Sequence, residues 1–404
     1  MPEAVIVAAT RTPIGRANKG SLKDFRPDDL TALITRAALD KVPALDPAEI
    51  DDFYLGCGLP GGESGNNMAR VVTTLLGYEI PGATITRYCS SSVQTTRMAF
   101  HAIKAGEGDV FVSAGVETVS RFQHGTSDHI PGTKNPLFAD AEERTKDYAQ
   151  GGKDWHDPRE DGLLPDIYIA MGQTAENVAR LRGLAREDLD HFGVRSQNLA
   201  EKAIDNGFWE REITPVTLPD GTVVTRDDGP RAGVTYEKVS QLEPVFRPDG
   251  VVTAANCCPL NDGAAAVVIM SDTKAAELGL TPLARIVSTG VSALSPEIMG
   301  LGPVEASRRA LKNAGMTIDD IDLVEINEAF AAQVLPSAED LGVDMDKLNV
   351  NGGAIAVGHP FGMTGARLQN TMLNSLDWHD KTTGLITMCV GGGQGMALIL
   401  ERMA

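Results

Sequence analysis

The sequence lacks an excess of basic residues, and it also lacks long apolar runs. Its 55 Asp and Glu outnumber its 36 Lys and Arg, which gives a formal net charge of −19 at pH 7. Nucleic acid binding needs a basic surface, so this balance argues against a nucleic acid partner, although a few local cations suffice for a small anionic ligand. No apolar run approaches the roughly 20 residues that cross a bilayer, so we expect no membrane span.

Cysteine is also scarce. The five cysteines stand at positions 57, 89, 257, 258 and 389, without the C-x-x-C spacing of zinc and redox motifs. An odd and thinly spread set is typical of a reducing compartment, so we expect a cytoplasmic protein with neither a disulfide framework nor a metal site. The N-terminus has no basic segment before a long apolar core, and residues 4–8 therefore predict a first strand rather than a signal peptide.

What the sequence does contain is glycine, 42 residues in all, and two regions that match each other in order. Residues 37–57 and 309–327 each consist of an Ala-rich helical pattern, a short Asp-rich connection and an apolar strand. Each is preceded by a predicted strand, at 4–8 and at 284–288. Alternating strands and helices predict parallel βαβ units, so the chain is predicted to be an α/β protein built as two similar halves.

Between the halves, residues 120–248 are rich in turn signals and interrupt the alternation. Helical patterns are predicted at 171–181 and 186–206, and a hairpin turn at 219–222. Such a long irregular insertion is more often functional than idle, so we expect it to cover a site. Strands predicted at 251–253 and 264–270 return to the first half. The predicted domains are 1–119 with 249–280, the insertion 120–248, and 281–404.

Cys89 is the first residue with a distinctive setting. Residues 83–86 are β-prone and the residues after Cys89, up to Gly106, favour a helix, so Cys89 is predicted where a strand turns into a helix. Free N–H groups and the helix dipole favour a thiolate there. Three serines, 90 to 92, suit a first turn held tightly against other backbone. A free cysteine is more often a small core residue, so this segment alone favours a structural role.

Three segments of the second half change that balance. Asn327 ends a predicted strand, at the carboxyl end where α/β sheets carry their sites. His359 lies in the glycine-rich stretch 351–365, whose tightly positioned backbone a solvated surface histidine does not need, and this favours a functional role. Cys389 precedes three glycines between two apolar strands. This cluster lacks the helix and acidic residue of a dinucleotide fingerprint, so it predicts a turn whose N–H groups approach a ligand.

Two cysteines and one histidine in such turns suggest thiol chemistry with a shared base. With these residues the chain resembles the thiolases, which include acetyl-CoA acetyltransferases and 3-ketoacyl-CoA thiolases. The resemblance spans nearly the whole chain, and its motifs occur in family order at 86–97, 171–176, 261–266, 327–330, 358–360 and 389–395. It implies two βαβαβαββ halves in a five-layered α-β-α-β-α core, with an inserted loop domain that covers CoA and substrate.

The resemblance also implies roles for individual residues in a ping-pong acyl transfer between CoA thioesters. Cys89 would carry the acyl group, and His359 would take its proton and later help to hold a thioester oxygen. Cys389 would act as acid and base at the α-carbon of acetyl-CoA. Asn327 would position a water in one oxyanion hole, and the N–H groups of Cys89 and Gly391 would form the second. One thiol becomes acylated while another moves a proton, so a single cysteine could not serve both roles.

Substrate contacts follow from the same resemblance. Arg231 falls where the family places a basic contact to the nucleotide part of CoA, although a solvated loop arginine is nearly as common. Met171 and Phe330 would line the acyl end of the pocket, and both also suit ordinary core. Cys258 stands where a pantetheine-contacting serine is commoner. CoA is a substrate in this scheme, so no cofactor is expected.

The family pattern is changed at a few further positions. Ala170 replaces a histidine that is frequent in short-chain members, Ser90 to Ser92 replace the commoner Ala or Gly, and Phe361 follows the His-Pro pair. These changes could reshape the acyl pocket without removing a catalytic residue. The implied partners are acyl-CoA and CoA, a second copy of the chain in a homodimer or homotetramer, and enzymes of β-oxidation.

Two other functions stay open from the sequence. One is a ketosynthase-type condensing enzyme that uses a carrier-protein thioester, and Asn327 and Cys389 argue against it because such relatives place other groups there. The second is a non-catalytic acyl-CoA or lipid-binding protein of the same fold, which the complete set of expected catalytic groups disfavours. Our leading prediction is a thiolase of lipid metabolism that cleaves 3-ketoacyl-CoA with CoA or runs the reverse Claisen condensation.

Overall fold

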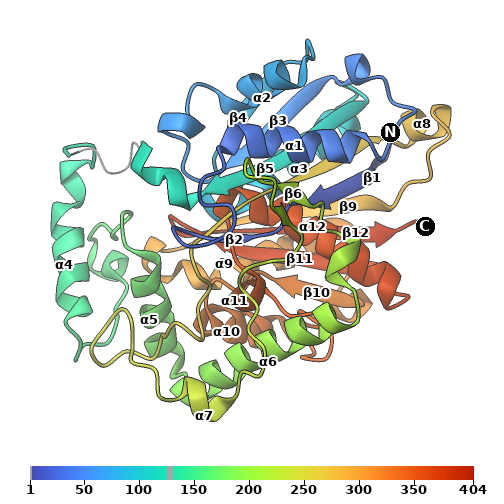
Figure 1. Ribbon diagram of the computed structural model, residues 1–404. Coiled ribbons are helices and arrows are strands. Elements are labelled where there is room, and N and C mark those ends of the chain that lie inside the picture. Colours follow the sequence, from blue (N-terminus) through green and yellow to red (C-terminus); the bar gives the residue numbers. More distant parts are fainter. Residues whose placement is uncertain (1, 125–130) are drawn as a thin grey trace.

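The first half of the protein forms one side of a large mixed sheet. The protein is described by a computed structural model that covers residues 2–124 and 131–404 (Figure 1). Strands lie in the order β4-β3-β5-β8-β1, with β3 parallel to β4 and β5, and β8 antiparallel to β5 and β1. Their bounds are Ala4–Arg11 (β1), Asp52–Cys57 (β3), Gly82–Ile85 (β4), Val110–Thr118 (β5) and Asn261–Ser271 (β8).

The second half repeats this order, which confirms the predicted duplication. Its strands are Ala284–Ala293 (β9), Leu323–Ile326 (β10), Thr383–Val390 (β11) and Gln394–Arg402 (β12), in the order β10-β11-β12-β9. A parallel bridge from Val324 to Leu348 continues beyond β10, in the place that β4 has in the first half. Two residue pairs between β1 and β9 join the halves into one ten-stranded sheet, to which the short β2 (Gly15–Arg16) also belongs.

Helices fill the space between the halves and cover both outer faces. Two helices, α3 (Ser91–Ala105) and α12 (Phe361–Trp378), share one apolar core with strands of both halves. The outer helices of the first half are α1 (Pro27–Leu39) and α2 (Met68–Leu76), and those of the second half are α9 (Gly302–Ala314) and α10 (Ala331–Leu341). The strands of each half thus form one layer on either side of α3 and α12. The resulting order is helices, first-half strands, helices, second-half strands, helices, which confirms the predicted five layers.

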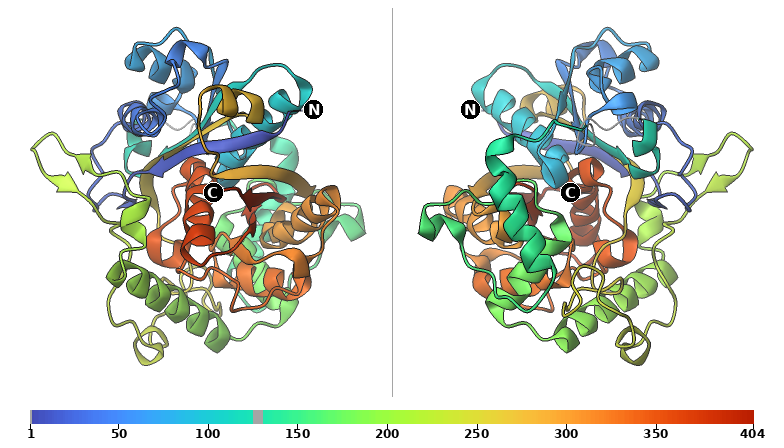
Figure 2. Two further views of the ribbon diagram at one scale, coloured as in Figure 1. Left: turned by 90° about the vertical axis from the view of Figure 1, so that its right-hand side faces the viewer. Right: turned by 90° about the vertical axis from the view of Figure 1, so that its left-hand side faces the viewer.

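The inserted segment wraps one side and the lower end of the molecule (Figures 1 and 2). It contains α4 (Ala139–Ala149), α5 (Met171–Arg182), α6 (Arg186–Asp205), α7 (Tyr236–Val239) and the hairpin of β6 (Val216–Thr217) and β7 (Val223–Val224). The helices predicted at 171–181 and 186–206 and the hairpin at 219–222 are therefore confirmed. Residues 125–130, within the predicted insertion, lie outside the described residues. The domain limits themselves stay a prediction.

A buried charge cluster fastens the insertion to β1. The guanidinium of Arg11 is fully buried, and it donates to Glu212 and, through Nη1 at 2.7 Å and Nη2 at 2.9 Å, to the carboxylate of Asp227. Both carboxylates belong to the insertion, so this bidentate contact fixes where the inserted chain crosses the first half. None of the helices in the two described ranges has both the length and the hydropathy that a bilayer-spanning helix requires.

The predicted strand at 251–253 is wrong. These residues form a loop, and the backbone N–H groups of Val251 and Val252 donate to the carboxylate of Glu176 on α5 rather than to a neighbouring strand. The local β-propensity of two valines is therefore overridden by a buried side-chain acceptor. The other predicted strand of this return, at 264–270, lies within β8.

Candidate active site

Cys89 lies in a one-turn helix, Tyr88–Ser90, between β4 and α3, as predicted. Serine hydroxyls fix this turn: Ser91 Oγ donates to Tyr88 O at 2.6 Å and accepts from the N–H of Arg87 at 2.9 Å. Ser92 Oγ accepts from the N–H of Ala366 on α12 at 2.8 Å. Ser90 Oγ donates to Arg87 O. The three serines therefore hold the Cys89 segment against its own backbone and against the second half of the chain, which matches the tight first turn predicted for them.

The predicted preference of Cys89 for a thiolate is wrong for the protein at rest. The side chain is only 7% exposed, and burial raises the pKa of the Cys89 thiol to about 12. Hydrogen bonds from the backbone N–H groups of Gly391 and of Cys89 itself oppose this rise, while the negative charge of Glu117 adds to it. Desolvation thus outweighs the helix terminus, so ionisation of Cys89 requires a base.

His359 lies between the short α11 (Ala354–Val357) and α12, and its ring packs edge-on against that of Phe361. Gly358 before it has φ of 113°, and a Cβ there would lie 2.7 Å from Ile14 Cγ2, so glycine is required at this approach. The N–H of His359 donates to Asn261 Oδ1 at 2.9 Å. Burial, and next the charge of Arg367, lowers the pKa of His359 to about 3, so the imidazole is neutral at pH 7.

A hydrogen-bond chain sets the tautomer of this neutral ring. Thr364 Oγ1 donates its only proton to Pro360 O at 2.8 Å, and this Thr364 hydroxyl oxygen lies 2.6 Å from His359 Nδ1. The hydroxyl therefore accepts from Nδ1–H, and Nε2 carries no proton. Asn327 Nδ2 lies 3.3 Å from that Nε2. Thr364 thus leaves Nε2 of His359 as the basic atom.

Asn327 follows β10 directly and is 1% exposed, at the strand end where the sequence predicted it. Its Nδ2 faces the imidazole of His359, while among the described residues its Oδ1 has no hydrogen-bond partner. A buried amide oxygen is costly to leave unpaired. This orphaned acceptor therefore marks the Asn327 side chain as a contact for a polar group that enters the site.

Cys389 is fully buried near the end of β11, and the turn after it passes close to Cys89. Gly392 and Gly393 have φ of 76° and 74°, which confirms the predicted glycine turn between antiparallel β11 and β12. A Cβ on Gly391 would lie 3.4 Å from the ring of Tyr88, the residue before Cys89. Burial, and then the neighbouring Cys89, raises the pKa of Cys389 well above its usual value.

Cys258 brings a third thiol to the same place. Its N–H donates to Ala329 O at 3.0 Å, and Cys257 forms an antiparallel bridge with Phe330, so this loop pairs with the segment that begins at Asn327. Burial raises the pKa of Cys258 far above its usual value, and the nearby Cys257, Cys89 and Cys389 thiols add to this. Both vicinal cysteines are free thiols, as the sequence suggested.

A pocket of about 580 Å³ opens onto Cys89. Aliphatic and aromatic side chains dominate its wall, which comes from both halves and from the insertion: Leu59, Tyr88, Cys89, Thr133, Lys134, Ile167, Tyr168, Ile169, Met171, Phe361, Gly391 and Gly392. Met171 therefore lines the pocket as predicted. Phe330 lies instead in the apolar cluster behind it, which also contains Cys389 and Met171, and packs edge-on against Phe246.

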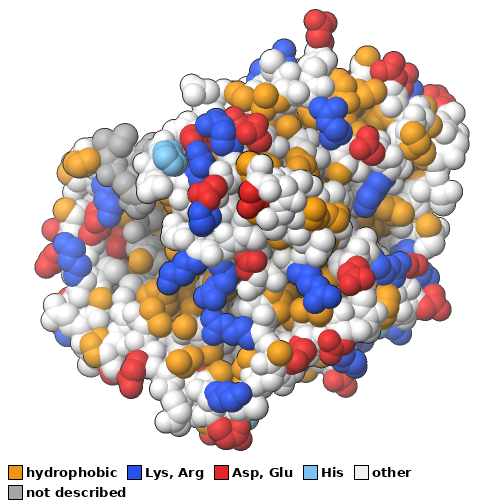
Figure 3. Space-filling view, in the orientation of Figure 1, with side chains coloured by type: hydrophobic (Ala, Val, Ile, Leu, Met, Phe, Trp, Pro, Cys, Tyr) orange, Lys and Arg blue, Asp and Glu red, His pale blue; other side chains and the backbone are white. Residues whose placement is uncertain are grey.

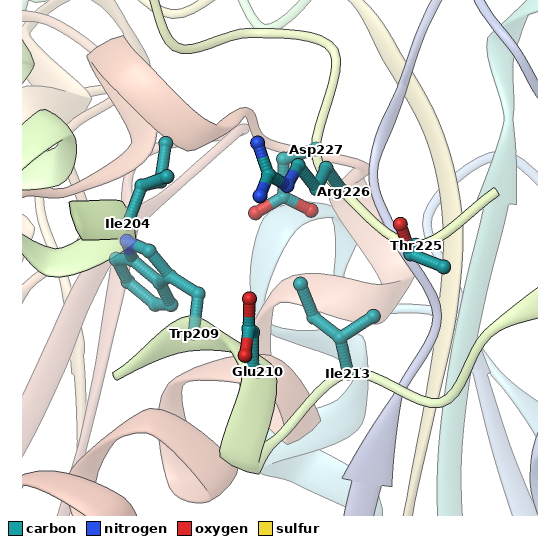
Figure 4. Close-up of a pocket in the computed structure, with 7 residues that line it drawn as sticks. All are labelled: Ile204, Trp209, Glu210, Ile213, Thr225, Arg226 and Asp227. Carbon is teal, nitrogen blue, oxygen red and sulfur yellow. The ribbon is translucent and has the colours of Figure 1, made fainter. Parts of the chain in front are cut away.

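Another hollow, shown in Figure 4, has a different character. It measures about 20 Å³, room for about one water, and lies between Trp209, Ile213 and Asp227 beside the buried Arg11 cluster. It contains none of the predicted site residues. The chamber of Cys89 is therefore the candidate active site.

Comparison with known proteins places this geometry in a family. Residues 4–273 match the model of the thiolase N-terminal domain, and residues 280–402 match that of the thiolase C-terminal domain. The chain belongs to the thiolase family. The predicted family, fold and acyltransferase class are thereby confirmed, and the ketosynthase and non-catalytic alternatives are not favoured.

Individual relatives agree with this over their full length. The 3-ketoacyl-CoA thiolase of Bacillus subtilis is 41% identical over 99% of this chain and 100% of its own. A β-ketoadipyl-CoA thiolase of Escherichia coli is 42% identical over 100% of both chains. The crystal structure of the dimeric peroxisomal thiolase of Saccharomyces cerevisiae superposes with a TM-score of 0.88, at 34% identity, over 99% of this chain and 97% of that one.

Arg231 does not belong to the described wall of the Cys89 pocket. Its side chain is exposed, and its N–H donates to Gln197 Oε1 at 2.9 Å. Gly229, two residues earlier, packs against the backbone of Ala356 on α11, close to His359. Lys and Arg side chains gather over the centre of the face in Figure 3 although the whole protein is acidic.

Sequence reasoning missed several residues of the thiolase site. The roles of Thr364 and Asn261 depend on hydrogen bonds to His359 that no local pattern announces. Lys134 reaches the pocket from the insertion, where irregular chain gives no periodicity to read. Glu117 did leave a signal, because a carboxylate at the end of the apolar strand β5 is unusual.

Proposed function

We propose that this thiolase uses Cys89 as its acyl carrier in the thiolysis of 3-ketoacyl-CoA by CoA, a reaction that it can also run backwards as a Claisen condensation. The supporting observation is that Cys89 and Gly391 line the same pocket, and that their backbone N–H groups act to lower the pKa of the Cys89 thiol against its burial. Donors in these positions are close to where the carbonyl oxygen of a Cys89 thioester would lie. A second cysteine, Cys389, lies nearby and stays free for proton transfer.

In the first half of the proposed reaction, His359 Nε2 takes the Cys89 proton as the sulfur attacks the 3-keto carbon. The bond between C2 and C3 then breaks, which leaves the acyl group on Cys89 and acetyl-CoA as its enolate. Cys389 gives its proton to C2 and becomes a thiolate. Asn327, through a water, and His359 are suited to hold the enolate oxygen of the thioester.

In the second half, the Cys389 thiolate takes the proton of an incoming CoA thiol. The CoA sulfur attacks the Cys89 thioester, and the shortened acyl-CoA leaves. The Cys89 sulfur recovers the proton held by His359, so all three groups return to their starting states. The protein's own thiols and imidazole thus supply the nucleophile and the proton transfers, and we propose that no cofactor takes part.

Turnover with free CoA thioesters tests this function. We expect purified protein to cleave acetoacetyl-CoA and longer 3-ketoacyl-CoAs with CoA alone, since the open pocket leads straight to Cys89. Loss of the 3-ketoacyl-CoA absorbance and appearance of acetyl-CoA measure the reaction. Cleavage that requires a carrier-protein thioester would instead support the ketosynthase alternative, and absence of any turnover would support the binding-protein alternative.

A second candidate substrate class is a 3-ketoacyl-CoA with a terminal carboxylate. Of the lining side chains in the described part of the chain, Lys134 alone carries a charge. Its ammonium pairs with Glu142 Oε2 at 2.6 Å and lies 5.2 Å from the ring centre of Tyr168, which also faces the pocket. The side chain is half exposed, so an acyl carboxylate could compete with Glu142 for it. The name of the E. coli relative, β-ketoadipyl-CoA thiolase, agrees with this class.

A matched pair of six-carbon substrates tests the role of Lys134. We expect Lys134→Met to lower kcat/KM for 3-oxoadipyl-CoA about fivefold, the size of a partly exposed ion pair, because the substrate loses its charge partner. Thiolysis of 3-oxohexanoyl-CoA should stay within about twofold, since methionine keeps the apolar wall. Equal changes for both substrates would exclude a carboxylate contact.

We also propose the setting in which the enzyme works. Exposed arginines on adjoining segments, Arg16, Arg226 and Arg231, are suited to the phosphates of CoA. In the described sheet β4 pairs on one side only, which leaves an edge that a second copy could extend into a homodimer, or further into a homotetramer. The cysteines are all free thiols, which suits the cytoplasm. A place in fatty-acid β-oxidation beside its partner enzymes fits the name of the B. subtilis relative.

A further inference from the structure

Glu117 is a buried carboxylate that the reaction described above does not use. It lies near the end of β5 and is 1% exposed. Its Oε2 accepts from the N–H groups of Gly58 at 2.7 Å and Gly362 at 2.9 Å. Its Oε1 accepts from the N–H of Leu59 at 3.3 Å, and the Cys57 thiol lies 3.7 Å from the same oxygen. Within residues 2–124 and 131–404 no Lys, Arg or His forms an ion pair with it.

These donors come from the two halves of the chain, which meet beside the active-site pocket. Gly58 and Leu59 follow β3 in the first half, whereas Gly362 belongs to the first turn of α12 in the second half. Leu59 and Phe361, the residue before Gly362, both line the pocket of Cys89. His359 lies three residues before Gly362, and its ring meets that of Phe361 edge-on at 5.4 Å. One carboxylate therefore joins two pocket walls and the segment of the catalytic imidazole.

The fit around this carboxylate is close. A Cβ on Gly58 would lie 2.6 Å from Glu117 Oε2 and 2.8 Å from Phe361 Cβ. A Cβ on Gly362 would lie 2.7 Å from Cys57 Cα. Backbone can approach Glu117 from both halves only because both positions are glycine, so the length of the Glu117 side chain sets how these two adjacent segments pack together.

The charge of Glu117 also acts on Cys89. Gly58, whose N–H donates to Glu117, packs against the residue before Cys89, since a Cβ on Gly58 would lie 3.4 Å from Tyr88 O. Glu117 is therefore near the Cys89 segment, and its charge adds to the rise that burial causes in the pKa of the Cys89 thiol. Burial raises the pKa of Glu117 itself to about 7, against the pull of its N–H donors, so the carboxylate is largely ionised above that pH. A negative charge held next to a buried thiol opposes formation of a second negative charge.

We propose that Glu117 is a positioning residue of the thiolase reaction, which sets how the segments of Leu59, Phe361 and His359 pack together and whose charge adds to the burial that keeps Cys89 a thiol until His359 takes its proton. This inference rests on the proposed role of Cys89 as the acylated nucleophile. It also accounts for a buried carboxylate without an ion pair near the proposed nucleophile, where its negative charge opposes ionisation of the thiol. A resting thiol is less open to alkylation and oxidation than a thiolate.

Two variants of the full-length protein separate charge from position. Glu117→Gln removes the charge and keeps the length, whereas Glu117→Asp keeps the charge and shortens the side chain by one methylene. The first readout is the rate at which iodoacetamide alkylates Cys89 at pH 8.5, with the site identified by peptide mass spectrometry. The second is kcat and KM for thiolysis of acetoacetyl-CoA. Thermal unfolding confirms that each variant folds, and Glu117→Met, of equal length and neutral, replaces Glu117→Gln if that variant does not.

We expect Glu117→Gln to speed alkylation of Cys89 about 3- to 10-fold, because loss of the charge raises the thiolate fraction. Glu117→Asp should alkylate within about twofold of wild type but lose at least about tenfold in kcat, because it cannot reach Gly58 and Gly362 together. Unchanged alkylation in the neutral variant overturns the charge role, and wild-type kcat in Glu117→Asp overturns the positioning role. The alkylation readout does not depend on turnover, so a failure of this inference is distinguishable from a failure of the proposed function, which acetyl-CoA labelling of another cysteine would show.

Discussion

Replacing Cys89 by alanine is expected to lower kcat of thiolysis by at least about 10⁴-fold, because no other group can accept the acyl chain. The neighbouring thiol of Cys389 is buried and that of Cys258 is partly buried, both have pKa values far above the usual range, and the imidazole of His359 is neutral. Steady-state assays measure the loss. Intact-protein mass spectrometry after incubation with acetyl-CoA should show one acetyl group on the wild type and none on Cys89→Ala.

Cys257→Ala is the matched control for this experiment. Cys257 is an adjacent thiol in the same apolar cluster as Cys389, but it is absent from the described wall of the Cys89 pocket. We expect this variant to keep its acetylation and to stay within about threefold of wild-type kcat, since only packing changes. An acetyl group found on Cys258 or Cys389 of the wild type would remove Cys89 from its proposed role.

The fold could be predicted where a local pattern coincides with the final packing. The apolar strand at 284–288 and the helical pattern at 186–206 are long and periodic, and each becomes β9 or α6 within a few residues. The duplication could be predicted because the same order of elements occurs twice. The strand predicted at 251–253 is absent because the backbone N–H groups of Val251 and Val252 donate to Glu176. This residue lies some 75 positions earlier, so no local pattern indicates the contact.

The site was predictable by residue type but not by ionisation state. A cysteine at the start of a helix suggests a thiolate, yet the structure buries Cys89 and adds the charge of Glu117, so the thiol is favoured. Nothing in the sequence indicates an unusual pKa for His359, whereas burial in the folded protein lowers this pKa to about 3 and the contact with Thr364 selects the tautomer of the ring. These effects depend on desolvation and on partners from distant segments, which only the folded chain provides.

The neutral His359 and the protonated thiols are consistent with the proposed use of two cysteines. A neutral imidazole can take one proton at a time, and the Thr364 contact leaves only Nε2 for it. In the proposed reaction, proton transfer to or from the α-carbon of acetyl-CoA therefore uses another group. We assign it to Cys389, a buried thiol of β11 that lies two residues before Gly391 and pairs with Gly395 of β12. This division of labour gives the last prediction.

Replacing Cys389 by alanine is expected to separate the two proton transfers of the reaction. A departing CoA thiolate is fairly stable near neutral pH, whereas an enolate requires an acid or base at carbon. We therefore expect acetylation of Cys89 by acetyl-CoA to slow by no more than about tenfold, while exchange of the C2 protons of acetyl-CoA with solvent deuterium falls at least about 10³-fold. Rapid-quench mass spectrometry follows the first step, and deuterium incorporation into acetyl-CoA follows the second.

Cys389→Ser and Cys258→Ala make this experiment specific. Serine keeps the size of the side chain but is a far weaker acid and base than a thiol, so it should resemble alanine in the exchange assay. Cys258→Ala removes the other thiol near Cys89 and should leave deuterium exchange within about threefold of wild type, because that thiol has no proposed step. If exchange instead disappears in Cys258→Ala and persists in Cys389→Ala, the acid and base at the α-carbon is Cys258 rather than Cys389.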